Sequence, residues 1–212
     1  MSDSANNLTH RRGPQPSVSL RPDLAVIAQN VAPGSRVLDI GCGDGALMLA
    51  LGERGCDVRG IEIDGDSVER CVSQGLSVVQ GDADRDLGDY PDKAFDVAVL
   101  SQTLQTAARP DLMLEQLLRV GRTAYVSFPN FAHWRMRRDL LIKGRMPVTR
   151  HLPVSWFETQ NIHHLTVSDF LSLVELKRAR VERRWYFAGD RRIAERGGNW
   201  RAEYALFEVS GA

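Results

Sequence analysis

A short buried strand that runs directly into a glycine-rich turn and a helix is the feature that most constrains the fold of this chain. Residues 37–45 read VLDIGCGDG, and residues 36–40 form an apolar, β-branched run. Glycines at Gly41, Gly43 and Gly45 allow the backbone to turn tightly and allow a ligand to approach without a Cβ in the way. In open α/β sheets, ligands bind beside such turns, at the carboxyl ends of the strands. The sequence therefore predicts a ligand-binding crevice after this strand.

Strands and helices alternate along the rest of the chain. Strands are predicted at residues 36–40, 58–63, 76–80, 95–100, 122–128, 181–188 and 200–209. Helices are predicted at residues 24–31, 46–53 and 133–143, after Asp64, from Pro110 and from Thr166. This alternation indicates βαβ units, and the last two strands, which lack a helix between them, should pair antiparallel at a sheet edge. We expect an α/β, Rossmann-like fold whose seven-stranded, mostly parallel sheet has one antiparallel strand and helices on both faces.

Length and composition favour one soluble domain. The 212 residues suffice for a single domain over residues 20–212, with residues 1–19 as a flexible N-terminal tail. The 27 basic and 27 acidic side chains balance, which argues against a general nucleic-acid or anionic-membrane binder. No apolar run is long enough for a membrane span or a secretion signal, so we expect a cytoplasmic protein. Three cysteines without a C-x-x-C pair indicate neither a disulfide framework nor a zinc site.

Charge is balanced in sum but not along the chain. Residues 39–96 hold fourteen acidic and five basic side chains, whereas residues 131–201 hold seven acidic and fifteen basic ones. Part of this excess is a cluster formed by Arg135, Arg137, Arg138, Lys143, Arg145 and Arg150. Such a cluster is typical of a solvated helix face, or of a partner surface when aromatic residues such as Trp134 and Trp156 accompany it.

Acidic side chains dominate the predicted crevice. Asp39 and Asp44 flank the glycine turn, Glu62 ends the second strand, and Asp82 follows the third. Two carboxylates at the turn would repel a pyrophosphate, so the turn favours a ligand with an ammonium or sulfonium charge over an anionic dinucleotide. Glu62 is placed to accept hydrogen bonds from ribose hydroxyls, and Asp82 from an adenine amino group. Ser101 ends the fourth strand beside the glycine turn.

The segments VLDIGCGDG, GIEID, QGDAD and FDVAVLSQTLQ resemble the class I S-adenosylmethionine (SAM)-dependent methyltransferases. More narrowly, SQTLQTAARPDLMLEQLLRVGRTAYVSFPNFAHWRMR, GRMPVT and WFETQNIHHLTVSDF resemble the MetW family of methionine biosynthesis proteins. This resemblance covers residues 20–188 and implies a class I methyltransferase fold with SAM, or S-adenosylhomocysteine, as the cofactor.

The resemblance also implies contacts for each part of the ligand. Asp39, Gly41 and Gly43 would line the methionine end of SAM, while Glu62 would hold the ribose and Asp82 the adenine amine. The complete set of expected cofactor-binding residues is Asp39, Gly41, Cys42, Gly43, Glu62, Ile63, Asp82, Ala83 and Ser101. The implied partner is homoserine O-acyltransferase, MetX, in the acylation of homoserine.

Catalytic residues are less evident. Asn130 and His133, which follow the fifth strand, are the candidates for positioning a methyl acceptor or accepting a proton. Gln102 and Gln105 follow the fourth strand, and the adjacent histidines at 163 and 164 are expected to fold back over the crevice. These histidines lack a third ligand at metal spacing, so we predict no metal site.

Three functions remain open at this point. In the first, the chain binds SAM and supports homoserine acylation as an activating or regulatory partner, because a methyltransferase fold does not guarantee methyl transfer. In the second, it is a free-standing methyltransferase that acts on a small molecule. The third, a nucleic-acid methylase that uses the basic second half, is the least favoured, since Ser101-Gln102-Thr103-Leu104 stands where such enzymes carry an Asn-Pro-Pro-aromatic run.

Overall fold

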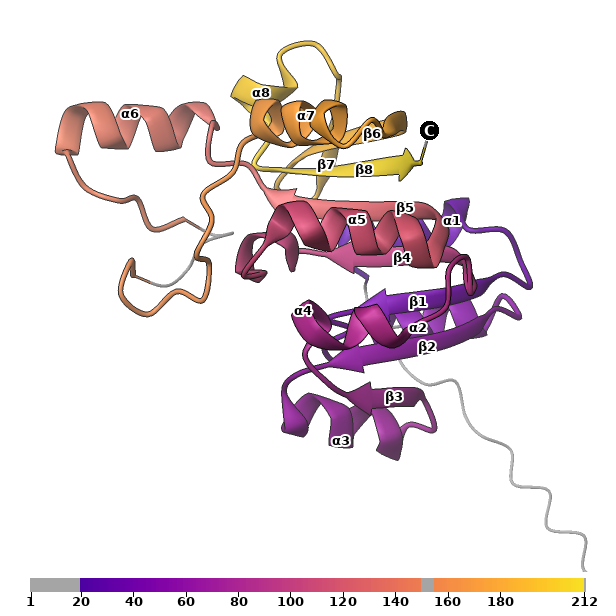
Figure 1. The fold of residues 1–212 in the computed structure, drawn as a ribbon. Helices are drawn as coiled ribbons and strands as arrows, with labels where there is room; N and C mark the ends of the chain where they lie inside the picture. Colours follow the sequence, from indigo (N-terminus) through magenta and orange to yellow (C-terminus); the bar gives the residue numbers. More distant parts are fainter. Residues whose placement is uncertain (1–19, 150–154, 212) are drawn as a thin grey trace, which may run out of the picture.

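The computed structural model describes residues 20–149 and 155–211. One mixed sheet runs through this part of the chain (Figure 1). The flexible tail expected at residues 1–19 lies outside the described residues, and so does Arg150 of the basic cluster.

Five parallel strands form one half of the sheet. They are β1 (Arg36–Ile40), β2 (Asp57–Glu62), β3 (Ser77–Gln80), β4 (Phe95–Ser101) and β5 (Gly121–Pro129). The other strands are β6 (Arg180–Ala188), β7 (Arg191–Ile193) and β8 (Tyr204–Ser210), and the order across the sheet is β3-β2-β1-β4-β5-β8-β6-β7. Since β1 has β2 on one side and β4 on the other, the strand order reverses there, and this is where open α/β sheets bind ligands.

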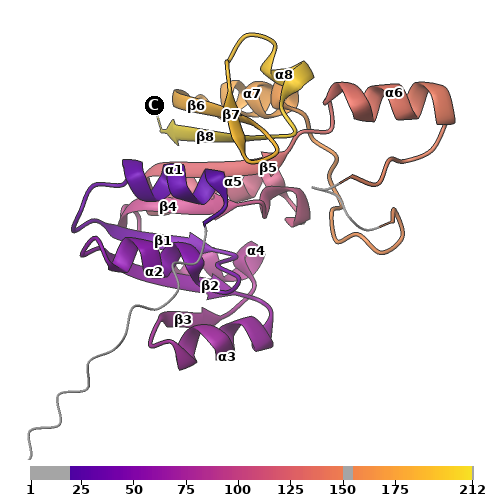
Figure 2. The same cartoon turned by 180° about the vertical axis from the view of Figure 1, so that it is seen from behind.

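Helices cover both faces of the sheet (Figures 1 and 2). On one face, α1 (Pro22–Asn30) and α2 (Ala46–Gly52) bury Ile27, Leu47 and Leu51 against the strands. On the other face, α5 (Pro110–Val120) and α7 (Val167–Leu176) bury Leu114 and Phe170. The remaining elements are α3 (Gly65–Ser73), α4 (Ala83–Asp86), α6 (Trp134–Lys143), α8 (Gly198–Arg201) and the short 3-10 turns η1 (Leu87–Asp89) and η2 (Leu104–Thr106).

The expected fold class is confirmed, with one strand more than expected. β8 pairs antiparallel with both β5 and β6, so the last two expected strands do pair, but β8 is inserted between β5 and β6. The strand expected at residues 200–209 begins only at Tyr204, because Gly197 adopts a left-handed φ of +75° and starts α8, which contains Trp200. β7 was not predicted because three residues are too few to show an alternating pattern.

Helix α6 stands apart from these layers. It leaves the body after β5 and projects away from the sheet, with the chain that follows it running alongside (Figures 1 and 2). It ends at Gly144, whose φ of +59° gives the left-handed C-cap that glycine accommodates best. Of its ten residues only Met136 is buried.

Among the described residues, no helix is both long and apolar enough to cross a lipid bilayer. The same residues contain no group of three or more His, Cys, Asp or Glu side chains arranged to hold a metal ion.

Candidate functional site

The glycine turn after β1 has the backbone geometry that its sequence requires. Gly41, Gly43 and Gly45 have φ values of +69°, +56° and +77°, in the left-handed region where a side chain is strained. A Cβ on Gly41 would also lie only 2.5 Å from Thr103 Oγ1, which belongs to the chain that follows β4. Gly41 is therefore required both by its backbone conformation and by the close approach of a neighbouring segment.

A cleft of about 460 Å³ opens beside this turn, at the carboxyl ends of β1, β2, β3 and β4. It is lined by five of the predicted residues, Gly41, Glu62, Ile63, Asp82 and Ala83. The other lining residues are Ile61, Gly81, Asp84, Gln102, Thr103, Thr106, Ala107, Met113 and Gln160. This described lining holds three carboxylates and neither Lys nor Arg, so it suits a ligand with positive charge and hydrogen-bond donors.

Glu62 ties the end of β2 to the glycine turn. Its side chain is almost fully buried, and its Oε2 accepts a hydrogen bond of 2.8 Å from the backbone N–H of Gly43. Its Oε1 accepts bonds of 2.9 and 3.0 Å from the N–H groups of Ile63 and Asp64. A carboxylate offers about four acceptor positions, so roughly one remains for a hydroxyl of a ligand in the cleft.

Asp82 is the N-cap of α4, and its carboxylate makes one hydrogen bond and one long ion pair. Its Oδ1 accepts from the N–H of Asp84 at 3.1 Å, and its Oδ2 lies 3.5 Å from Nε of Arg85, which is exposed. The Asp82 side chain is itself about one-third exposed, at the edge of the cleft. This position leaves acceptor capacity for an amino group of a ligand.

Asp39 is a buried carboxylate at the end of β1, next to the glycine turn. Its exposed fraction is 2%, and among the described residues no donor lies within hydrogen-bonding distance of its side chain. Burial raises the pKa of Asp39 to about 7, with Arg21 lowering it and Glu62 raising it further. A cationic group beside Asp39 would favour its ionised form, so the residue is suited to an ammonium or sulfonium ligand.

A polar network that the sequence did not predict joins α1 to the ends of β4 and β5. Asp23 is fully buried and accepts hydrogen bonds from Ser127 Oγ at 2.7 Å and Ser101 Oγ at 3.1 Å. Arg21 donates to Asp23 at 3.2 Å and to Ser101 Oγ at 2.5 Å, and its charge also acts on Asp39. The network fixes α1 against the sheet and holds a half-exposed guanidinium at the end of β4, within electrostatic range of Asp39.

A loop from the second half of the chain borders the other side of the cleft. Gln160 lines the cleft, and the N–H groups of Ile162 and His163 donate to the backbone oxygen of Gln105 at 3.1 and 3.0 Å. This arrangement places residues 160–163 against η2, but the two histidines expected over the crevice, His163 and His164, are not among the residues that line the cleft. Gln102, at the same edge, has a φ of +54°, a strained conformation that is often found at functional sites.

The two catalytic candidates do not lie in this cleft. Asn130 and His133 line a second cavity of about 210 Å³ at the base of α6. Asn130 donates from Nδ2 to the backbone oxygens of Asn199 and Ala202, at 3.0 and 2.8 Å. Its Oδ1 accepts from the N–H groups of Ala132 and Val167, both at 3.2 Å. These four bonds use the whole capacity of the amide, so Asn130 holds three chain segments together and has no group left for a methyl acceptor.

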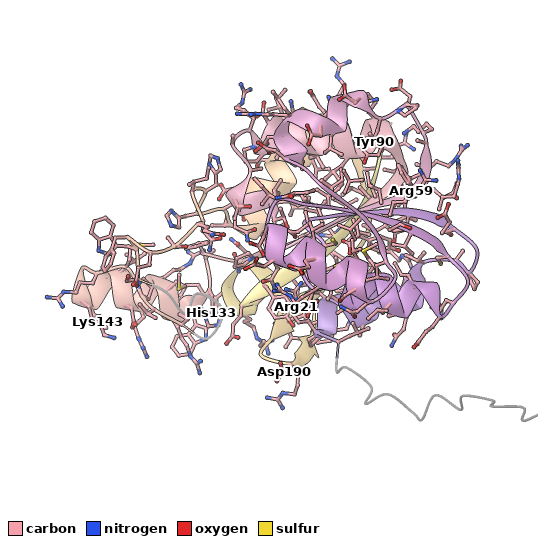
Figure 3. The ribbon with its side chains drawn as sticks, turned by 90° about the horizontal axis from the view of Figure 1, so that it is seen from below. Arg21, Arg59, Tyr90, His133, Lys143 and Asp190 are labelled. Carbon is pink, nitrogen blue, oxygen red and sulfur yellow. The ribbon has the colours of Figure 1, made fainter. Side chains whose placement is uncertain are left out.

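Four predicted cofactor-binding residues do not line the cleft: Asp39, Cys42, Gly43 and Ser101. Cys42 packs in a small apolar cluster with Met48 and Cys71 behind the turn. The N–H of Gly43 is used by Glu62, and Ser101 belongs to the network with Asp23. His133 is buried where α6 leaves the body, and its ring lies 5.8 Å from that of Trp134 (Figure 3).

This sheet order, glycine turn and acidic strand end define the Rossmann-like fold of class I methyltransferases, and comparison with solved structures bears this out. The chain is similar to SAM-dependent methyltransferases from Mesorhizobium loti (TM-score 0.66, 18% identity, 87% of this chain and 95% of that one) and Archaeoglobus fulgidus (TM-score 0.64, 16% identity, 88% and 93%). At these identities the likeness shows the fold alone.

The family is shown by two further comparisons. The family model "Methionine biosynthesis protein MetW" matches residues 21–209, so the chain belongs to the MetW family of methionine biosynthesis proteins. The chain is also 31% identical over 176 residues to the bifunctional methionine biosynthesis protein MetXA/MetW of Rhodopirellula baltica. That alignment covers 78% of this chain but only 28% of the longer relative.

Proposed function

We propose that this chain binds SAM in the cleft and acts with homoserine O-acyltransferase as its activating or regulatory partner. The observation that supports SAM as the ligand is Asp39, a buried carboxylate with a pKa raised to about 7, next to a glycine turn and an acidic cleft. The partner is supported by the relative in which MetXA and MetW form one protein.

The cleft offers a separate place for each part of SAM. In this proposal the charged methionine end lies at the glycine turn, where Gly41 lines the cleft and lets a ligand approach the backbone, and where Asp39 and Gly43 lie just behind the lining. Glu62 accepts from one ribose hydroxyl with its remaining acceptor position, and Asp82 accepts from the adenine amine. Arg21 completes this proposed set, because its half-exposed guanidinium is bonded to Ser101 at the end of β4 and its charge, which reaches Asp39, could pair with the carboxylate of methionine.

A regulatory role fits the polar groups around the cleft better than a catalytic one. The catalytic candidates line another cavity, and Asn130 is fully engaged by backbone groups. A protein that binds SAM without consuming it can report the level of a methionine derivative to an enzyme of the same route, through a coupling free energy between two binding events.

One observation favours the alternative, a free-standing methyltransferase acting on a small molecule. Within the part of the chain that the structure describes, Gln105 Oε1 and His163 Nε2 are buried without a hydrogen-bond partner, and both residues belong to the segments that border the cleft. Unpartnered buried polar atoms carry a free-energy cost, and a bound substrate that hydrogen-bonds to them would relieve it. In this alternative, His163 takes the proton that the small-molecule substrate loses when it receives the methyl group.

The two functions differ in what happens to SAM. With purified acyltransferase and homoserine, we expect this chain to raise the rate of acylation, and we expect the rise to change as SAM is titrated. A Glu62→Ala variant should lose the SAM dependence, because the residue links the turn to the ligand. Acylation that is identical with and without the chain at every SAM level would contradict the proposal. Formation of S-adenosylhomocysteine with a cell metabolite extract would then support the methyltransferase.

A further inference from the structure

Exposed apolar side chains gather on one projecting part of the molecule, which we call the arm. The arm comprises α6 and the flanking residues 144–149 and 155–162. Of the fourteen large apolar side chains that are exposed in the described chain, eight lie on it: Leu140, Leu141, Ile142, Met146, Val148, Trp156, Phe157 and Ile162. Leu141 and Ile142 are 86% and 73% exposed, and Trp156 is 74% exposed. Such a concentration of exposed apolar side chains on one segment is typical of an interaction surface.

The arm gains little support from the body of the protein. α6 projects from the sheet (Figures 1 and 2), with His133 at its base and Lys143 at its outer end (Figure 3). Helices shorter than about 12–15 residues are marginal in water without tertiary packing, and α6 has ten residues with only Met136 buried. A partner that covers Leu141 and Ile142 would supply the missing packing.

The charges of the arm indicate what kind of partner fits. Its described residues include five basic side chains, Arg135, Arg137, Arg138, Lys143 and Arg145, against two acidic ones, Asp139 and Glu158. Arg135 and Arg138 lie over the Trp134 ring, at 5.3 and 5.4 Å from its centre. Apolar, aromatic and arginine side chains together are the composition of protein interfaces, and this one matches an apolar groove bordered by carboxylates.

A second copy of the chain fits less well. In a symmetric dimer the same patch meets itself, so the basic excess of one arm would face that of the other. An acidic partner of a different sequence avoids this repulsion.

The arm is also continuous with the cleft. Gln160 lines the cleft, while Trp156 and Phe157, four and three residues earlier, present their rings to solvent and contact each other edge to face. The backbone bonds from Ile162 and His163 to Gln105 hold this segment against η2. A partner seated on Trp156 and Phe157 would therefore touch the segment that borders the ligand.

We infer that the arm is the surface on which the acyltransferase docks, with an apolar, carboxylate-bordered groove of that enzyme taking α6. The inference rests on the proposed function, which supplies the partner. It adds that docking covers a segment of the cleft wall, so that partner binding and SAM binding influence each other through residues 156–163.

The test is a double substitution on the arm, Leu141→Asp with Ile142→Asp, and a matched control elsewhere. Leu176, at the end of α7, is also a highly exposed leucine, at 75%, so Leu176→Asp, compared with Leu141→Asp alone, makes the same chemical change away from the arm. Affinity for immobilised, purified acyltransferase should fall by about tenfold or more in the arm variant and stay within about twofold in the control. SAM affinity and thermal stability should be retained in both, since the substituted side chains face solvent.

The possible failures are distinguishable. If the unsubstituted chain does not bind the acyltransferase, the proposed function fails, and the arm assignment fails with it. If the unsubstituted chain binds and the arm variant binds equally well, only the arm assignment is overturned. If light scattering finds a dimer that the arm variant dissociates while acyltransferase binding persists, a second copy occupies the arm and the assignment is again overturned.

Discussion

Replacing Asp39 with Asn should weaken SAM binding and at the same time stabilise the unliganded protein above pH 7. Asp39 is buried, none of the described residues donates a hydrogen bond to its side chain, and burial raises its pKa to about 7 from an ordinary value of 3.8. The ionised form is therefore costly in the empty cleft and useful only when a cationic ligand is present. Loss of stability in exchange for binding is common at functional sites.

The pH dependence of unfolding gives the sign of this effect. Between about pH 4 and pH 7 the folded protein keeps the Asp39 proton while the unfolded chain has lost it, so the free energy of unfolding falls as pH rises. The slope from this one group approaches 1.36 kcal/mol per pH unit, or roughly 4 kcal/mol over the interval. Above pH 7 both states are ionised and the penalty stays constant. Ligand affinity runs in the opposite direction, and SAM should bind more tightly as pH rises through about 7.

Denaturant unfolding and SAM titration between pH 5 and pH 8 measure both effects on one pair of proteins. The difference in unfolding free energy between Asp39→Asn and the unsubstituted chain should grow with pH and level off above pH 7. Asp57→Asn, an exposed carboxylate at the other end of neighbouring β2, serves as the control and should change neither quantity. Equal pH slopes for Asp39→Asn and the unsubstituted chain would contradict the account of Asp39.

Replacing Gly41 with Ala should abolish detectable SAM binding. The new Cβ would lie 2.5 Å from Thr103 Oγ1, and the residue would also have to hold a φ of +69°. The turn and the end of β4 must therefore separate, which displaces the backbone that the ligand approaches. We expect a loss of affinity of at least about 100-fold, or roughly 2.7 kcal/mol.

Gly34 separates the steric effect from backbone strain. It has a φ of +77°, but a Cβ added there would meet nothing within 4 Å, and it lies in the turn before β1. Gly34→Ala should lower the melting temperature through backbone strain and leave SAM affinity unchanged. Calorimetric titration checks both variants, and equal losses of affinity in the two would show that the close approach to Thr103 is unimportant.

Most of the fold and part of the site could be predicted because the signals are local. The run VLDIGCGDG fixes a strand, a turn and a helix within a few residues, and the carboxyl ends of parallel strands meet at one edge. This reasoning placed Gly41, Glu62 and Asp82 at the same cleft.

The parts that were missed depend on contacts between distant positions. The bond from Ser127 to Asp23 spans 104 positions, and α1 gave only a helix pattern, so the role of Arg21 could not be predicted. Asn130 follows a strand end and looked available to a substrate, but its partners Ala202 and Val167 come from segments far along the chain. Only the three-dimensional structure shows that its amide is fully used.

Titration of SAM and NAD into the purified, unsubstituted chain at pH 8 tests the central claim most directly. The account predicts saturable binding of one SAM per chain and no binding of NAD at concentrations up to ~1 mM, because three carboxylates line the cleft and Asp39 lies buried beside the turn. Absence of SAM binding, or binding of NAD as tight as that of SAM, would contradict it.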